Sequence, residues 1–129
     1  MNDCLVEIAT IHEEKRSVLR VKGAFERRED GFVAIYPQDG DETTLVLAGD
    51  TLTMTRRGET ELSAKFHVGE DTSLVLRFGE HEGSIPIQTF DCFHHLEGNN
   101  KTCVTLKYAL VYPDHLQRFS LEIVISEEK

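Results

Sequence analysis

The 129-residue sequence has few of the features that mark a secreted, membrane-spanning or metal-stapled protein. It contains three cysteines, no Cys-x-x-Cys motif and no spacing typical of a zinc site. We therefore expect free thiols in a cytoplasmic protein that carries no cofactor. The longest apolar runs, such as Phe32–Tyr36 and Tyr108–Tyr112, hold five residues, whereas a membrane span needs about 20. The N-terminus lacks the basic start and long apolar run of a signal peptide.

Motifs of common enzymes are also missing. The sequence has no G-x-S-x-G elbow, no H-E-x-x-H pair and no glycine-rich phosphate loop followed by a helix. We therefore name no catalytic residue. The formal net charge of −9 repels phosphate backbones and anionic lipids, which weighs against nucleic-acid and membrane binding. A chain of this length predicts one domain over residues 1–129.

Regularly spaced glycines supply the clearest pattern that is present. From Gly31 to Gly79 they recur every nine to eleven residues, most of them beside acidic or polar side chains. Glycine reaches positive φ freely and aspartate tolerates tight turns, so these positions predict hairpin turns between short strands. The intervening strands are expected at about 4–12, 16–27, 31–37, 43–48, 50–57 and 83–96, among others.

Apolar and polar side chains alternate between those turns. Leu62, Ala64, Phe66 and Val68 share one face of their segment, and the segments from Leu74, Val104 and Phe119 follow the same rule. A period of two over so many segments predicts half-buried antiparallel strands. Only the stretch His12–Ser17 looks briefly helical. A sheet with no helix to cover it must close on itself, which favours an all-β, up-and-down antiparallel barrel of about eight to ten strands over a sandwich.

Several short motifs resemble a known family when they are taken in order over residues 20–125. They are Arg56-Arg57-Gly58, Lys65-Phe66-x-x-Gly69, Phe78-Gly79-Glu80, Gly83-x-Ile85-x-Ile87-x-Thr89 and Tyr108-Ala109-Leu110. The sequence is similar to the YwiB-like family of small bacterial proteins. The resemblance implies a lipocalin-like, or calycin-like, barrel, and it supplies no catalytic residue.

Candidate ligand-binding residues are Arg56, Thr89 and Tyr108, which are polar or amphipathic positions within those motifs. If they face the barrel interior, Arg56 can pair with an anionic group while Thr89 and Tyr108 orient it by hydrogen bonds. In the alternative, Tyr108 packs in the core and Arg56 is exposed.

Candidate metal ligands are Cys92 and His94, which alternation places on one face of a strand. Zinc accepts both ligand types, but a site needs a third or fourth ligand, and the sequence names none. A solvated strand end rich in histidine is the competing interpretation, and it is the one we prefer.

The leading functional hypothesis is non-catalytic binding of a small, partly apolar and possibly anionic ligand in or at the mouth of the barrel. A filled barrel that binds a protein partner is the alternative, because Pro86 predicts an edge strand or a bulge, and an exposed edge can accept a partner strand. An enzyme whose site is not visible in the sequence is the lesser alternative. An interior cavity of about 300 Å³ or more would favour the first hypothesis.

Overall fold

The computed structural model describes residues 1–128, and within them the chain forms ten β-strands and no helix. That part of the chain accordingly holds no helix long and apolar enough to cross a membrane. The strands are β1 (Asn2–His12), β2 (Lys15–Arg28), β3 (Gly31–Gln38), β4 (Asp41–Ala48), β5 (Thr51–Arg57), β6 (Thr60–Phe66), β7 (Thr72–Phe78), β8 (His81–Glu97), β9 (Lys101–Val111) and β10 (Leu116–Glu127).

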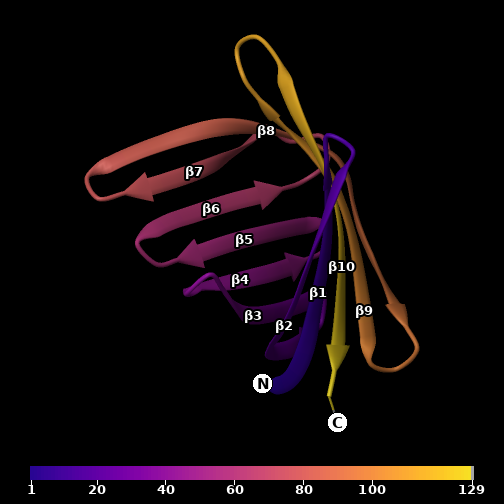
Figure 1. Ribbon diagram of the computed structural model, residues 1–129. Coiled ribbons are helices and arrows are strands. Elements are labelled where there is room, and N and C mark those ends of the chain that lie inside the picture. Colours follow the sequence, from indigo (N-terminus) through magenta and orange to yellow (C-terminus); the bar gives the residue numbers. More distant parts are fainter. Residues whose placement is uncertain (129) are drawn as a thin grey trace.

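The ten strands form a closed antiparallel barrel (Figure 1). Each strand pairs with the next one along the chain, and β10 pairs with β1 to close the ring. Connections of two to five residues join the strands. The predicted all-β, up-and-down barrel is therefore confirmed, with ten strands at the upper end of the expected range.

The alternating pattern places one face of every strand inside the barrel. Leu45 of β4, for example, lies opposite Ala34 of β3 on one side and Met54 of β5 on the other. Directly opposed residues in antiparallel strands point to the same face of the sheet. The strand register therefore keeps the apolar faces of neighbouring strands on the inside of the barrel. For this reason, period-two alternation in the sequence predicted the architecture.

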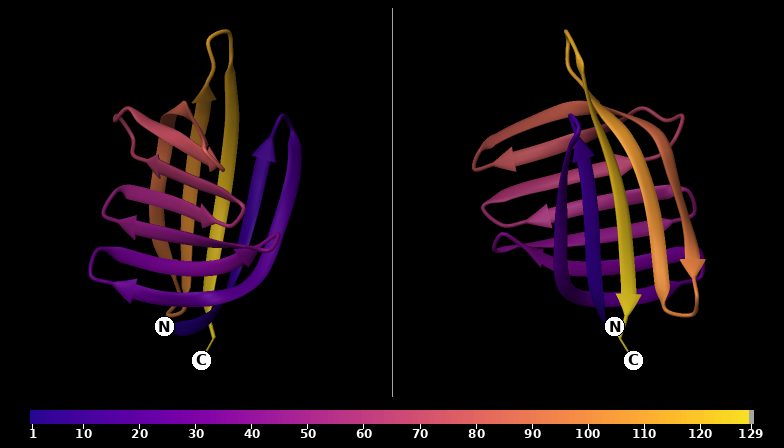
Figure 2. Two further views of the ribbon diagram at one scale, coloured as in Figure 1. Left: turned by 90° about the vertical axis from the view of Figure 1, so that its left-hand side faces the viewer. Right: turned by 45° about the vertical axis from the view of Figure 1, so that its right-hand side comes forward.

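The barrel strands fall into two groups that run in different directions, and the long strand β2 bends from one group into the other. Strands β3 to β7 lie across the direction of β1, β9 and β10 (Figure 1). Strand β2 curves from one group into the other (Figure 2). Its residues pair with β1 from Lys15 to Phe25, whereas its register with β3 covers only Ala24–Arg28. The first half of β2 thus runs away from β3 and leaves the barrel open on that side.

Gly23 stands where β2 leaves β3. A Cβ atom on this residue would collide with the carbonyl oxygen of Ile35 and would lie 3.1 Å from the Cβ of Tyr36. Glycine is the residue that permits such a close approach of two backbones. Gly23 therefore allows β2 to lie close to β3 at the point where the pairing of the two strands ends.

The hydrophobic core fills one half of the barrel, near the chain termini. The rings of Phe25 and Phe32 lie 5.4 Å apart there, and both side chains are buried. Their fully buried neighbours are Cys4, Val6, Leu45, Leu52, Val104, Leu106, Ile123 and Ile125. Farther along the same strands the interior side chains are only partly buried, as at Leu19, Met54, Leu62, Tyr108 and Phe119. We call these two regions the filled half and the open half.

Most of the predicted turns are confirmed. Gly40, Gly49, Gly69 and Gly79 lie between strands with positive φ. The helical interpretation of His12–Ser17 is wrong, because these residues end β1 and begin β2 around a two-residue turn. Both turn residues, Glu13 and Glu14, have positive φ (50° and 65°). A type I′ hairpin turn requires that conformation, but its usual sequence signature is Asn-Gly. The sequence Glu13-Glu14 therefore did not indicate a turn.

Pro86 lies in the part of β8 that pairs with β7, opposite Ser73. The register of β8 with β9 begins one residue later, at Ile87, and a bulge follows between Thr89 and Asp91. The expected edge strand is not found, because β8 lies between β7 and β9 in the closed barrel. The residues of β8 up to Pro86 pair with β7 alone, and the bulge lies farther along the strand than Pro86. Proline has no N–H to donate and is tolerated where a ladder ends.

Candidate functional site

The open half of the barrel contains a cavity of about 410 Å³. It lies between the first half of β2 and the ends of β3, β4, β5 and β6, and β1, β9 and β10 complete its wall. Its apolar lining includes Ile8, Leu19, Met54, Leu62, Phe119 and Leu121. Its polar lining comprises Thr10, Ser17, Tyr36, Gln38, Thr43, Arg56 and Tyr108. We call it the Arg56 cavity.

Strand register brings the central polar residues together. Thr43 of β4 lies directly opposite Tyr36 of β3 on one side and Arg56 of β5 on the other. All three therefore point to the same face of the sheet, which is the barrel interior. Tyr108 enters from β9, where it lies opposite Phe119. The cavity thus brings Tyr36 and Tyr108 together although they are 72 positions apart in the sequence.

Arg56 is held at the rim of the cavity by carboxylates. Its Nε donates a hydrogen bond of 3.1 Å to Oδ2 of Asp41, and its Nη2 lies 3.4 Å from the carbonyl oxygen of Gln38. Asp39 is more distant, at 3.6 Å, and its side chain is 81 % exposed, so water screens that pair. Gly58 leaves room for this arrangement, since a Cβ there would collide with the carboxylate of Asp41.

Two tyrosines supply neutral hydroxyl groups to the cavity. Burial raises the pKa of Tyr36 to about 12, although the nearby positive charge of Arg56 acts in the opposite direction. Burial also raises the pKa of Tyr108 to about 12. The Tyr108 ring packs between Phe66 and Phe119, with ring centroids 4.7 Å and 5.2 Å away. Both phenols are therefore protonated near neutral pH and can donate a hydrogen bond.

The hydroxyl of Thr43 has no hydrogen-bond partner among residues 1–128. Its side chain is 1 % exposed. A buried hydroxyl without a partner costs about 1–3 kcal/mol. Rotation about χ1 exchanges the hydroxyl and methyl positions of threonine between staggered wells.

The structure brings together two of the three predicted ligand-binding residues. Arg56 and Tyr108 both line the Arg56 cavity. Thr89 lies opposite Tyr108 in the register of β8 and β9, but it lines a separate hollow with Thr72 and Pro86. Its hydroxyl is buried and, like that of Thr72, has no partner in the described part of the chain.

Sequence reasoning missed Tyr36 and Thr43. Strand alternation could have indicated Tyr36, because it lies two and four residues after the buried residues Ala34 and Phe32 and so shares their face of β3. Counting across the Gly40 turn would also have placed Thr43 opposite Tyr36. Tyrosine and threonine are also common strand formers, so the residue types alone do not mark these positions as cavity lining.

The two predicted metal candidates are not joined by a third ligand in the described residues. Cys92 lies opposite Leu106 and is half-buried, and burial raises the pKa of its thiol. His94 is exposed in a hollow beside Leu96 and Phe32. All three cysteines of the chain are free. Potential metal ligands gather instead on the other face of β8, as described below.

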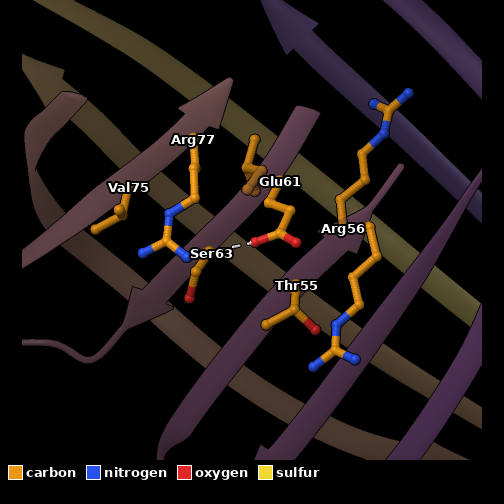
Figure 3. A pocket seen from close by; sticks show the side chains of 8 residues that line it. Thr55, Arg56, Glu61, Ser63, Val75 and Arg77 are labelled. Carbon is orange, nitrogen blue, oxygen red and sulfur yellow. Dashed lines mark ion pairs between the residues drawn. The ribbon is translucent and has the colours of Figure 1, made fainter. Parts of the chain in front are cut away.

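A second, smaller hollow lies along β5, β6 and β7 (Figure 3), and it shares Arg56 and Leu62 with the Arg56 cavity. It has a volume of about 240 Å³, below the range of about 300–1,000 Å³ typical of ligand sites. Arg77 there is compensated by Glu61 at 3.8 Å and Glu82 at 3.5 Å. Of these two hollows, the Arg56 cavity is therefore the stronger candidate for a ligand site.

Fold and cavity together define a closed ten-stranded β-barrel protein with an interior cavity open to solvent. The chain belongs to the family described as "Domain of unknown function (DUF1934)", whose model matches residues 6–123. A structure titled "Crystal structure of ywiB protein from Bacillus subtilis" is similar, with a TM-score of 0.80 and 14 % sequence identity over 99 % of this chain and 93 % of that one. The expected resemblance is thus confirmed, and at this identity it concerns the fold alone. A search of curated proteins found no match.

Proposed function

We propose that this protein binds a small, partly apolar ligand in the Arg56 cavity without catalysing its conversion. The observation that carries the proposal is a cavity of about 410 Å³ in which an apolar wall meets a few convergent polar groups. Ligand sites of small molecules combine those two properties. The ten-stranded barrel fits the lipocalin-like arrangement, and barrels of that size can hold one small ligand.

The donors in the cavity indicate what the polar end of the ligand must be. Arg56 and the neutral phenols of Tyr36 and Tyr108 all donate hydrogen bonds, so they complement an acceptor such as a carboxylate or a carbonyl. Asp41 already compensates part of the Arg56 charge. An anionic ligand would therefore share the guanidinium with Asp41, and a neutral carbonyl would bind without displacing it.

The same observations weigh against the alternatives. A filled barrel acting only as an interaction module does not account for a cavity of this size. For catalysis, a general acid or base needs a pKa near the working pH. The tyrosines in the cavity have pKa values of about 12 instead. Binding without chemistry is therefore the better supported proposal.

Laurate and methyl laurate are suitable probes, because they share an apolar chain and differ in the charge of the polar end. We expect Arg56→Gln to weaken laurate binding at least tenfold, since a charge-assisted hydrogen bond contributes about 1.5–3 kcal/mol. Binding of the ester should change less. Isothermal titration calorimetry measures both affinities.

Arg57→Gln is the matched control, because Arg57 is the neighbouring arginine on the opposite face of β5 and is exposed. It should bind laurate as the wild type does. Circular dichroism checks that both variants remain folded. Equal loss of affinity in the two variants would mean that long-range charge, and not the cavity, attracts laurate.

A further inference from the structure

A cluster of three potential metal ligands lies at the hairpin that joins β8 and β9. His95 and Glu97 come from β8, and Cys103 comes from β9. One ligand atom from each lies within 4.8 Å of the other two. We propose that His95, Glu97 and Cys103 bind one divalent cation of the zinc class on the outer face of the barrel.

The hairpin register explains why these residues meet. His95 is directly opposite Cys103, and Glu97 is directly opposite Lys101. His95 and Glu97 are two positions apart on one strand and so share a face, which places Glu97 diagonal to Cys103. The turn at Gly98, with a φ of 68°, holds the two strands in this alignment. Three ligands are thus supplied by rigid, paired strands and not by a loop.

The chemistry of the donors fits zinc better than magnesium or calcium. Imidazole, thiolate and carboxylate are all zinc ligands, whereas magnesium and calcium take oxygen ligands only. Metal bonds of about 2.0–2.3 Å require ligand atoms within about 3.8 Å of one another, so side-chain rotation must close the cluster by roughly 1 Å. Three protein ligands leave a fourth tetrahedral position for water.

The surroundings of Cys103 indicate what binding must change. The thiol donates a hydrogen bond of 3.4 Å to Oε2 of Glu97. Upon binding, the sulfur–metal bond forms, the S–H bond breaks and the proton leaves to solvent. His95 and Glu97 are exposed, so the cation can reach the cluster directly from water. Glu122 adds negative charge near Cys103, and Lys101 opposes it.

This site is independent of the Arg56 cavity, with which it shares no lining residue. It also differs from the Cys92 and His94 pair, because successive residues of a strand point to opposite faces. His94 and His95 therefore lie on opposite faces of β8. Loss of the metal site would leave ligand binding in the cavity intact, and the reverse also holds.

Cobalt titration of tag-free, EDTA-dialysed protein tests the proposal. We expect one equivalent of Co²⁺ to produce the sulfur-to-cobalt charge-transfer band and the intense visible bands of a tetrahedral thiolate site, and Zn²⁺ to displace it. Cys103→Ser should abolish the charge-transfer band. His95→Gln and Glu97→Gln should each weaken Zn²⁺ binding, measured by calorimetry, at least about tenfold.

Cys92→Ser and His94→Gln are the matched controls, since they alter the same residue types on the neighbouring face. Both should keep the spectrum and the affinity of the wild type. The absence of stoichiometric Co²⁺ and Zn²⁺ binding would overturn the proposal. A charge-transfer band that survives Cys103→Ser and disappears with Cys92→Ser would also overturn it. Thermal melts in the absence of metal verify that every variant is folded.

Discussion

Replacement of Thr43 by valine separates stability from binding in the Arg56 cavity. Valine has nearly the shape of threonine but lacks the hydroxyl, which in the structure is buried without a partner among the described residues. Removing an unsatisfied buried hydroxyl recovers about 1–3 kcal/mol. We therefore expect Thr43→Val to stabilise the ligand-free protein by about 1–2 kcal/mol.

The size of the expected effect makes it measurable. For a chain of 129 residues, the unfolding entropy of about 2.1 cal/mol/K per residue converts 1 kcal/mol into roughly 4 °C of Tm. Urea unfolding should show a higher midpoint and an unchanged slope. If the hydroxyl bonds to a ligand, the same variant should bind laurate more weakly than the wild type does.

Thr72→Val is the matched control. The Thr72 hydroxyl is also buried and without a partner in the described chain, but the residue lies outside the Arg56 cavity. It should raise stability in the same way and leave laurate affinity unchanged. If Thr43→Val lowered the urea midpoint, the hydroxyl would have a partner that the reasoning omits. Unchanged laurate affinity would remove Thr43 from the proposed site.

Three further predictions concern the stability of the barrel. Gly23→Ala should destabilise the protein by about 2 kcal/mol or more in urea unfolding, because the added Cβ would collide with the backbone of β3. Gly83→Ala should be nearly neutral in the same assay, because the described structure leaves open space around its Cβ. Replacing Glu13-Glu14 by Asn-Gly should stabilise the β1–β2 turn by about 1 kcal/mol, seen as a higher Tm, since both residues have positive φ. Folding raises the pKa of Tyr36 and Tyr108 from 10.0 to about 12. The stability that these tyrosines contribute is therefore complete below pH 10 and is lost as the pH rises towards 12. Urea midpoints that stay constant between pH 10 and pH 12 would contradict the burial of the two phenols.

The fold was largely predictable because local signals agreed with one another. Alternation at Leu62, Ala64 and Phe66 and regular turn glycines such as Gly49 predicted antiparallel strands, and closure followed from the lack of any covering helix. The turn at Glu13 was missed because the residue type carries no turn signature. Tertiary pairing, and not local propensity, imposes its positive φ.

The site was only partly predictable because the cavity depends on where a ladder ends. Arg56 and Tyr108 were candidates because they are polar positions within the family-like motifs, but the sequence left open whether they face the interior, where both line the cavity. The separation of β2 from β3 beyond Ala24 opens the cavity, and no local pattern encodes that separation. For this reason Thr89, on a strand beyond the cavity wall, was grouped with them.

The cluster of His95, Glu97 and Cys103 was missed for a related reason. Two neighbouring histidines drew attention to His94, but the partner of each depends on the register across the β8–β9 turn. Placing His95 opposite Cys103 requires the length of that turn, which the sequence Gly98-Asn99-Asn100 does not determine uniquely.

The central claim is that the Arg56 cavity holds the ligand, and native mass spectrometry with laurate tests it most directly. Leu19 lines the cavity from the half of β2 that does not pair with β3. Leu19→Trp should therefore fill part of the cavity, because this half of the strand can shift to accommodate the larger side chain. We predict one laurate per chain on the wild type and none on the variant, with both proteins folded by circular dichroism. Equal laurate occupancy on the two proteins, or none on either, would contradict the account.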